Sequence, residues 1–149
     1  MSTTPSCFDV ERIGKVAHLR LNRPDAYNSM TREFWSELPA LVRELDDDGT
    51  VRAIVISSTG KHFSAGMDLA VFTGGGGDAL GGAATDGSRA EEGRVRARLM
   101  QSVRLLQDSF TALERVRMPV IAAIQGGCIG GAVDMVSACD LRYASADAF

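Results

Sequence analysis

Along this chain, short runs of apolar residues alternate with longer segments in which apolar residues recur at the spacing of a helix. Residues 15–21 alternate in part and predict a strand that enters from a turn at Gly14. The apolar run 51–57 predicts a strand buried on both faces, and 120–124 predicts another buried strand. Residues 141–144 predict a further short strand.

Between these runs the spacing changes to that of helices. Thr31 can cap a helix that runs to about Leu45, in which Pro39 predicts a kink or an early break. A second helix is predicted from Gly93 to the Met118-Pro119 pair, and a third over 130–138. The first helix carries a broad apolar face of Phe34, Trp35, Leu38, Leu41, Val42 and Leu45. Strands alternating with helices imply crossover connections and an α/β fold.

Composition predicts one globular domain over residues 1–149. The chain is 45% hydrophobic with a mean hydropathy near zero, enough to bury one core. Glycine dominates residues 73–88, which predicts a flexible loop. The net charge of −3 is spread along the chain and argues against a nucleic-acid partner.

The N-terminus and the cysteines bear on location and cofactors. Residues 1–6 lack the basic start and apolar run of a secretory signal, and no apolar stretch is long enough to span a bilayer. We therefore expect a cytoplasmic protein without a membrane partner, and an organellar location stays open. The three cysteines have no metal-ligand spacing, so we expect reduced thiols and no metal site.

Two glycine-bearing stretches are the candidate chemistry. Residues 61–69 read Lys-His-Phe-Ser-Ala-Gly-Met-Asp-Leu, and residues 126–134 read Gly-Gly-Cys-Ile-Gly-Gly-Ala-Val-Asp. Each follows an apolar run and precedes a helix-compatible segment, so each can present free backbone N–H groups. Two such donors on one carbonyl would form an oxyanion hole. Either stretch alone is better explained as a tight strand-to-helix turn. Neither matches a dinucleotide fingerprint or a P-loop.

Residues 16–149 resemble the enoyl-CoA hydratase/isomerase, or crotonase, superfamily. The resemblance is carried, in order along the chain, by residues 21–29, 63–69, 119–134 and 138–143. It implies a spiral of β-β-α units, incomplete at the C-terminus. It also implies an acyl-CoA thioester as substrate, coenzyme A as part of that substrate, and no separate cofactor.

The same resemblance assigns roles to individual residues. The backbone N–H groups of Met67 and Gly131 would hold the thioester oxygen, and Asp134 would be the catalytic carboxylate. The contacts to coenzyme A would come from Ala26, Ala65, Gly66, Met67, Asp68, Leu69 and Gly131. His62 has no partner visible in the sequence and is expected to be solvated.

Asp134 also bears on the type of reaction. It stands three residues after Gly131, and its apolar sequence neighbours predict partial desolvation, which favours the neutral carboxyl. The simpler alternative is a first-turn acid that interacts with the helix dipole. An aspartate here resembles the dienoyl-CoA isomerase branch, with enoyl-CoA hydratase as the alternative.

Members of the superfamily continue well past the position of Phe149. That region carries a second acid/base group and helices that join subunits into trimers or hexamers. Glu91 and Glu114 do not match the position of that second group, and both look solvent-facing. The chain alone is therefore expected to lack the second acid/base residue. An alternative of another class is a non-catalytic acyl-CoA-binding or truncated subunit.

Overall fold

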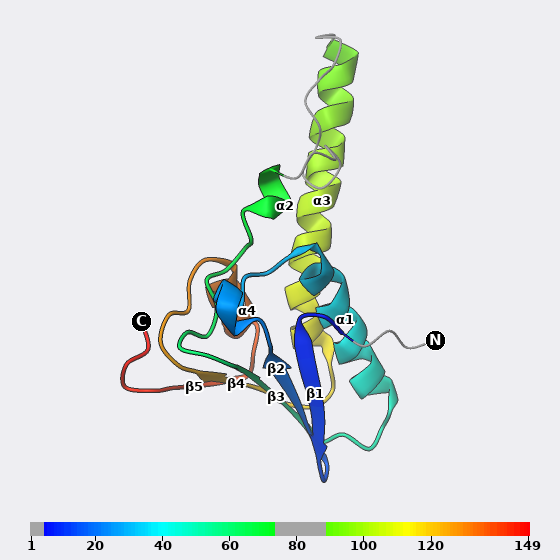
Figure 1. Ribbon diagram of the computed structural model, residues 1–149. Helices are drawn as coiled ribbons and strands as arrows, with labels where there is room; N and C mark the ends of the chain where they lie inside the picture. Colours follow the sequence, from blue (N-terminus) through cyan, green and yellow to red (C-terminus); the bar gives the residue numbers. More distant parts are fainter. Residues whose placement is uncertain (1–4, 74–88) are drawn as a thin grey trace.

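A single five-stranded sheet organises the chain in the computed structural model, which describes residues 5–73 and 89–149 (Figure 1). The strands are β1 (Phe8–Ile13), β2 (Val16–Leu21), β3 (Ala53–Ser58), β4 (Val120–Ile124) and β5 (Leu141–Ala144). They lie in the order β1-β2-β3-β4-β5. β1 pairs antiparallel with β2, and the other neighbours are parallel. Parallel neighbours require crossover connections, so the α/β prediction is confirmed.

The helices connect successive parallel strands. They are the 3-10 turn η1 (Pro24–Ala26), α1 (Arg32–Asp47), α2 (Ala70–Thr73), α3 (Arg89–Arg115) and α4 (Gly131–Ser137). The predicted early break at Pro39 is wrong, because α1 continues through it to Asp47. Its buried positions, Phe34, Leu38, Val42 and Leu45, lie on both sides of Pro39. Their burial, roughly 1.5–3 kcal/mol per side chain, offsets the ~3 kcal/mol that an interior proline costs.

Helices cover one face of the sheet. Along β2 the side chains of Ala17, Leu19 and Leu21 are buried, and the alternate positions are half-buried. β3 repeats the pattern with Ile54 and Ile56. The expectation that 51–57 is buried on both faces is therefore wrong for the described chain, because α1 and the C-terminal part of α3 lie against the same side (Figure 1).

Single bridge residues follow the parallel strands and precede the helices. Met30, between β2 and α1, pairs in parallel with Met67, which precedes α2. Ser64, after β3, pairs in parallel with Cys128, which precedes α4. Each winding thus contains a sheet strand, a short second pairing and a helix. This is the β-β-α spiral that the resemblance implies.

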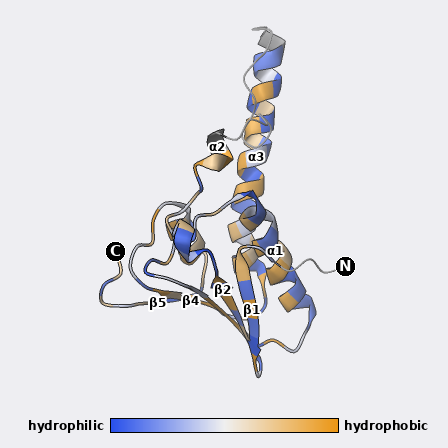
Figure 2. Cartoon of the chain, viewed as in Figure 1, coloured by the Kyte–Doolittle hydropathy of each residue, from blue (hydrophilic) through white to orange (hydrophobic). Residues whose placement is uncertain are grey.

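α3 begins and ends a few residues before its predicted bounds, and only its C-terminal part packs. It begins at Arg89, and Ser109, Ala112 and Leu113 are buried near its end. Its N-terminal part extends away from the sheet and shows hydrophilic and hydrophobic residues in mixed order (Figure 2). Leu99 and Leu105 are exposed there. The loop predicted over 73–88 lies, except for Thr73, outside the described residues.

The remaining expectations concern thiols, metals and membranes. Cys7 and Cys139 are buried and Cys128 is half-buried, and each is unpaired in the structure. That they are reduced stays a prediction. Burial raises the pKa of Cys139 to about 12. Within residues 5–73 and 89–149, three or more His, Cys, Asp or Glu side chains nowhere gather as they would around a metal ion. No helix in the same ranges combines the length and apolarity that crossing a membrane requires.

Candidate active site

The two glycine-bearing stretches run side by side. Phe63 N–H donates to Gln125 O at 2.8 Å, and Ser64 N–H donates to Gly127 O at 3.1 Å. In return Ile129 N–H donates to Ser64 O at 3.1 Å. These bonds form a short parallel ladder between residues that are about sixty positions apart. The ladder sets how the chain enters α4.

Gly66 makes the closest approach between the two stretches. Its φ is +82°, in the left-handed region. A Cβ at this position would lie 2.5 Å from Ile129 O and 3.2 Å from Gly131 N. Any side chain would therefore push the two stretches apart. Gly66 therefore serves both purposes expected of glycine here: it allows a tight turn, and it lets the two stretches that carry the donors approach closely.

The amides of Met67 and Gly131 are left out of the backbone pairing. Met30 N–H donates to Gly66 O at 2.8 Å, and Asp68 N–H donates to Met30 O at 3.0 Å, so the bridge uses the residues on either side of Met67. Gly131 is the first residue of α4, where an amide has no carbonyl within the helix to bond. Neither amide donates a hydrogen bond to any residue that the structure describes.

One cavity collects the three predicted catalytic residues. It has a volume of about 640 Å³, and Met67, Gly131 and Asp134 line it together with Trp35 and one side of α3. A cavity of this size holds a substantial part of a small ligand. We call it the reaction cavity. The residues predicted from two separate stretches thus face one volume.

Asp134 lies at the edge of this cavity rather than in an apolar surrounding. Its side chain is exposed, and Met135 and Val136 beside it are buried in the core. The expected desolvation of Asp134 is therefore wrong for the described chain. Successive residues of a helix point about 100° apart, so apolar neighbours in the sequence need not surround a side chain.

Glu114 is a second carboxylate at the reaction cavity. It lies near the end of α3 and is exposed, as predicted, yet it lines the same cavity as Asp134. Its position in the sequence does not match the superfamily pattern, so the resemblance assigns it no role. The signal that could have found it is the spacing of Gln107, Thr111 and Glu114, which places all three on one side of α3.

The Asp68 carboxylate is held by its own chain. It accepts hydrogen bonds from Ser29 Oγ at 2.7 Å and from Ala70 N–H at 2.9 Å, and Arg23 Nη1 lies 3.9 Å away. The Ala70 N–H and the Ser29 hydroxyl hold the pKa of Asp68 below its usual range. Asp68 thereby fixes the start of α2. Its backbone, rather than its side chain, remains the candidate contact to coenzyme A.

The other predicted coenzyme A contacts lie along the same edge. Ala65 N–H donates to Tyr27 O at 2.9 Å, which places Ala26 close to Ala65. Ala26 is half-buried, Ala65 is exposed, and the Leu69 side chain is 77% exposed. These residues therefore border solvent, as a site for a large nucleotide requires.

The Asn28 side chain links the chain segments that form this edge. Its side chain is buried, with φ at +52°. The amide group donates to Thr59 O at 2.8 Å and to His62 O at 3.1 Å, and Oδ1 accepts from Arg23 N–H at 2.8 Å. One buried amide thus ties the turn after β2 to the loop after β3.

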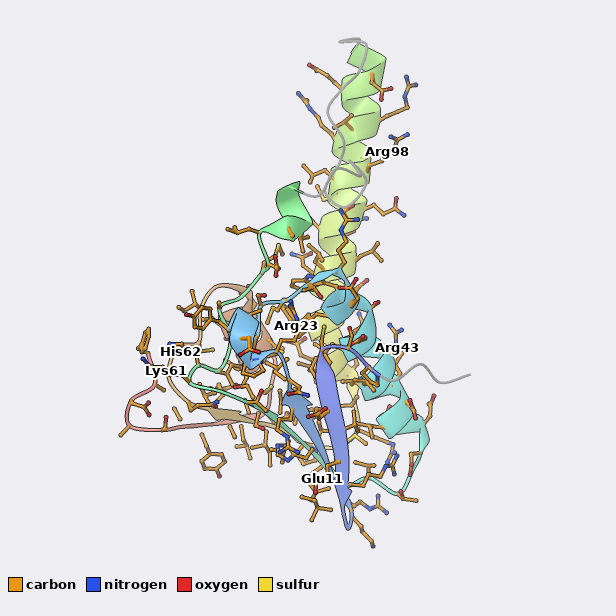
Figure 3. The ribbon with its side chains drawn as sticks, viewed as in Figure 1. Glu11, Arg23, Arg43, Lys61, His62 and Arg98 are labelled. Atoms are coloured by element: carbon orange, nitrogen blue, oxygen red, sulfur yellow. The ribbon has the colours of Figure 1, made fainter. Side chains whose placement is uncertain are left out.

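His62 has partners that the sequence does not reveal. Its Nδ1 accepts a hydrogen bond from Gly127 N–H at 2.9 Å. Its ring lies 5.9 Å from that of Tyr27 and 6.0 Å from that of Phe149, measured between centroids. The expectation of a solvated His62 without a partner is wrong. Figure 3 shows it beside Lys61, close to the C-terminal end of the chain.

Comparison with known proteins agrees with this geometry. The enoyl-CoA hydratase/isomerase family matches residues 11–149. This chain therefore belongs to the enoyl-CoA hydratase/isomerase family. The peroxisomal Delta(3,5)-Delta(2,4)-dienoyl-CoA isomerase of Arabidopsis thaliana is 41% identical over 90% of this chain and 46% of its own length. The mitochondrial enzyme of the same name from Homo sapiens is 41% identical over 90% of this chain and 38% of its own length.

A solved structure shares the fold. The structure of a Thermobifida fusca YX protein in complex with acetoacetyl-CoA matches with a TM-score of 0.77 and 31% identity, over 96% of this chain and 52% of that one. The chain thus spans about half the length of the relatives it matches.

Proposed function

We propose that this chain forms part of an acyl-CoA isomerase of the dienoyl-CoA type. The observation that carries the proposal is the reaction cavity, which is lined by two residues with unpaired backbone amides, Met67 and Gly131, and by the carboxylate of Asp134, three residues after Gly131. The names of the relatives at 41% identity favour the dienoyl-CoA substrate. Coenzyme A enters as part of the substrate, and the proposed chemistry uses no other cofactor.

The proposed reaction moves a proton along a conjugated acyl chain. A base removes a proton beside one double bond, and the electron pair shifts toward the thioester oxygen. The amides of Met67 and Gly131 donate to that oxygen as it gains charge, and one such donor is typically worth ~3 to 4 kcal/mol. An acid then returns a proton at a distant carbon, which restores the carbonyl. Asp134 serves one of these two proton transfers.

Enoyl-CoA hydration is the second candidate. It is favoured by the presence of two carboxylates, Asp134 and Glu114, at one cavity, because two carboxylates can hold and activate a water. A relative that bears the name short-chain-enoyl-CoA hydratase, from Clostridium acetobutylicum, is 31% identical. Binding of acyl-CoA without turnover is the alternative of another class.

The test compares both reactions in the protein at its natural length. Product formation from a dienoyl-CoA and from an enoyl-CoA is measured for the wild type and for Asp134→Asn. We expect isomerised product to dominate, and the substitution to lower kcat by roughly 10²- to 10⁴-fold while the Kd for acyl-CoA changes little. Asp9→Asn, the same chemical change at an exposed position of β1 outside the cavity, is the matched control and should stay within about twofold.

Each other outcome points to a different conclusion. Dominant hydrated product would replace the isomerase with the hydratase. Full activity in Asp134→Asn would remove this carboxylate from the mechanism. Binding without any turnover in the wild type would favour the non-catalytic alternative.

Assembly and location stay predictions. We propose a homotrimer or hexamer in the cytoplasm, without nucleic-acid or membrane partners. Relatives with the dienoyl-CoA isomerase name are peroxisomal or mitochondrial, so an organellar location is the alternative.

A further inference from the structure

A second cavity adjoins the reaction cavity. It has a volume of about 550 Å³ and lies between α1, Val71 of α2 and α3. Two residues, Trp35 and Leu106, line both cavities. They therefore form the wall between the two volumes, which we call the partition.

Trp35 is held in the partition from several sides. Its ring centroid lies 5.3 Å from that of Phe34 and 5.2 Å from that of Phe110. Ser109 Oγ donates to Trp35 O at 2.9 Å, which ties α3 to α1 at this level. The ring atom Cη2 is 3.8 Å from the position that a Cβ would take at Gly131. The indole thus stands next to one of the two proposed oxyanion donors.

The indole N–H is also unsatisfied. Its Nε1 is buried and has no hydrogen-bond partner among the described residues. A buried indole N–H usually has a partner. The ring is therefore placed by packing alone, and its removal would break no side-chain hydrogen bond.

The second cavity suits the far end of a hydrocarbon chain. Pro39, Val71 and Leu105 supply apolar walls, and Arg32 and Arg43 lie at its exposed rim. Figure 3 shows Arg43 on α1, on the side of the molecule away from His62. Ser36, Ser102 and Asp108 also line the cavity, so an acyl chain that passed the partition would contact the apolar side chains in a volume that is polar at its margins.

We propose that Trp35 is a specificity-determining residue that sets the longest acyl chain the site accepts. Trp35 and Leu106 line both cavities, so their side chains stand between an acyl chain in the reaction cavity and the second cavity. Without the indole the two cavities join, and longer chains extend into the second. This inference rests on the proposed function, because it requires an acyl-CoA in the reaction cavity.

The test is a chain-length profile in the natural-length protein. The ratio kcat/KM is measured for straight-chain substrates of increasing length in the wild type, Trp35→Ala, Leu106→Ala and Leu99→Ala. In Trp35→Ala and Leu106→Ala we expect the ratio of kcat/KM for long chains to kcat/KM for short chains to rise tenfold or more over the wild type. Each added methylene that becomes buried raises kcat/KM about fourfold. Leu99→Ala is the matched control, because Leu99 lies on the same helix, is exposed and lines neither cavity.

Fluorescence gives a second readout. Trp35 is the only tryptophan among these 149 residues, so the difference in emission between the wild type and Trp35→Phe isolates its signal and reports the partition. Acyl-CoA should change the emission by an amount that depends on the length of the acyl chain, and free coenzyme A should not. An unchanged length profile in both partition variants, or emission that ignores chain length, would overturn the inference. A wild type that neither converts nor binds any acyl-CoA would instead refute the proposed function.

Discussion

Replacing Gly66 with alanine perturbs the contact that joins the two glycine-bearing stretches. The added Cβ would sit 2.5 Å from Ile129 O, a backbone atom that cannot rotate away. Two costs add up. An L-residue in the left-handed region loses roughly 1–2 kcal/mol, and forcing extra volume into a packed contact costs typically another 1–3 kcal/mol. We expect the free energy of unfolding to fall by about 2–5 kcal/mol in total.

The same substitution should affect catalysis more than stability alone explains. Relief of the clash moves Ile129 and the Gly131 amide away from Met67. Loss of one oxyanion donor typically lowers kcat by about 10²- to 10³-fold. We therefore expect turnover of the folded variant to fall by that order at a temperature well below its unfolding midpoint.

Gly14→Ala is the matched control for this prediction. Gly14 also has a positive φ, +61°, but a Cβ there would meet nothing within 4 Å. Gly14→Ala should therefore lower the free energy of unfolding, measured in urea, by roughly 1–2 kcal/mol, and its turnover should not fall. If Gly66→Ala matches Gly14→Ala in both stability and kcat, the argument from close approach is refuted.

Two further predictions concern the support of the site and its response to acid. Asn28→Ala removes three part-buried hydrogen bonds between a buried side chain and the backbone, and should lower the free energy of unfolding by about 2–4 kcal/mol in urea melts. The exposed Asn22→Ala should cost less than ~0.5 kcal/mol, and equal effects would contradict the anchoring role. The Arg12 guanidinium, 2.6 Å from Asp48, helps to lower the pKa of that carboxyl from 3.8 to about 2. Because the folded pKa is the lower one, this stabilisation is present above about pH 4 and is lost as the pH falls toward 2. Asp48→Asn should therefore flatten the acid limb of the stability profile measured by thermal unfolding, and an unchanged limb would contradict the ion pair's role.

The strands and main helices could be predicted because their patterns are local. β4 and β5 match their predicted ranges, and α1 ends within two residues of its prediction. β1 could not be predicted, because only Phe8 of its six side chains is buried and the strand therefore carries no alternating pattern. α2 lies in the helix-compatible segment predicted after residues 61–69, but its bounds could not be predicted, because Asp68 before it is held by Ser29, which is 39 positions away in the sequence.

The site could be predicted in its residues but not in its environment. Met67, Gly131 and Asp134 were placed by motif, and they line one cavity. The exposure of Asp134 and the arrival of Glu114 depend on how α3 and α4 pack, which no local pattern encodes. The bond from Gly127 N–H to His62 likewise joins residues 65 positions apart.

The central claim is that the Met67 and Gly131 amides donate to one thioester oxygen. Amide proton and nitrogen resonances of these two residues can be followed by NMR while a non-reacting acyl-CoA is added to the natural-length protein. We expect both amide protons to move downfield together with one binding constant, and free coenzyme A not to reproduce the change. Shifts elsewhere around the reaction cavity, with these two amides unmoved, would contradict the claim.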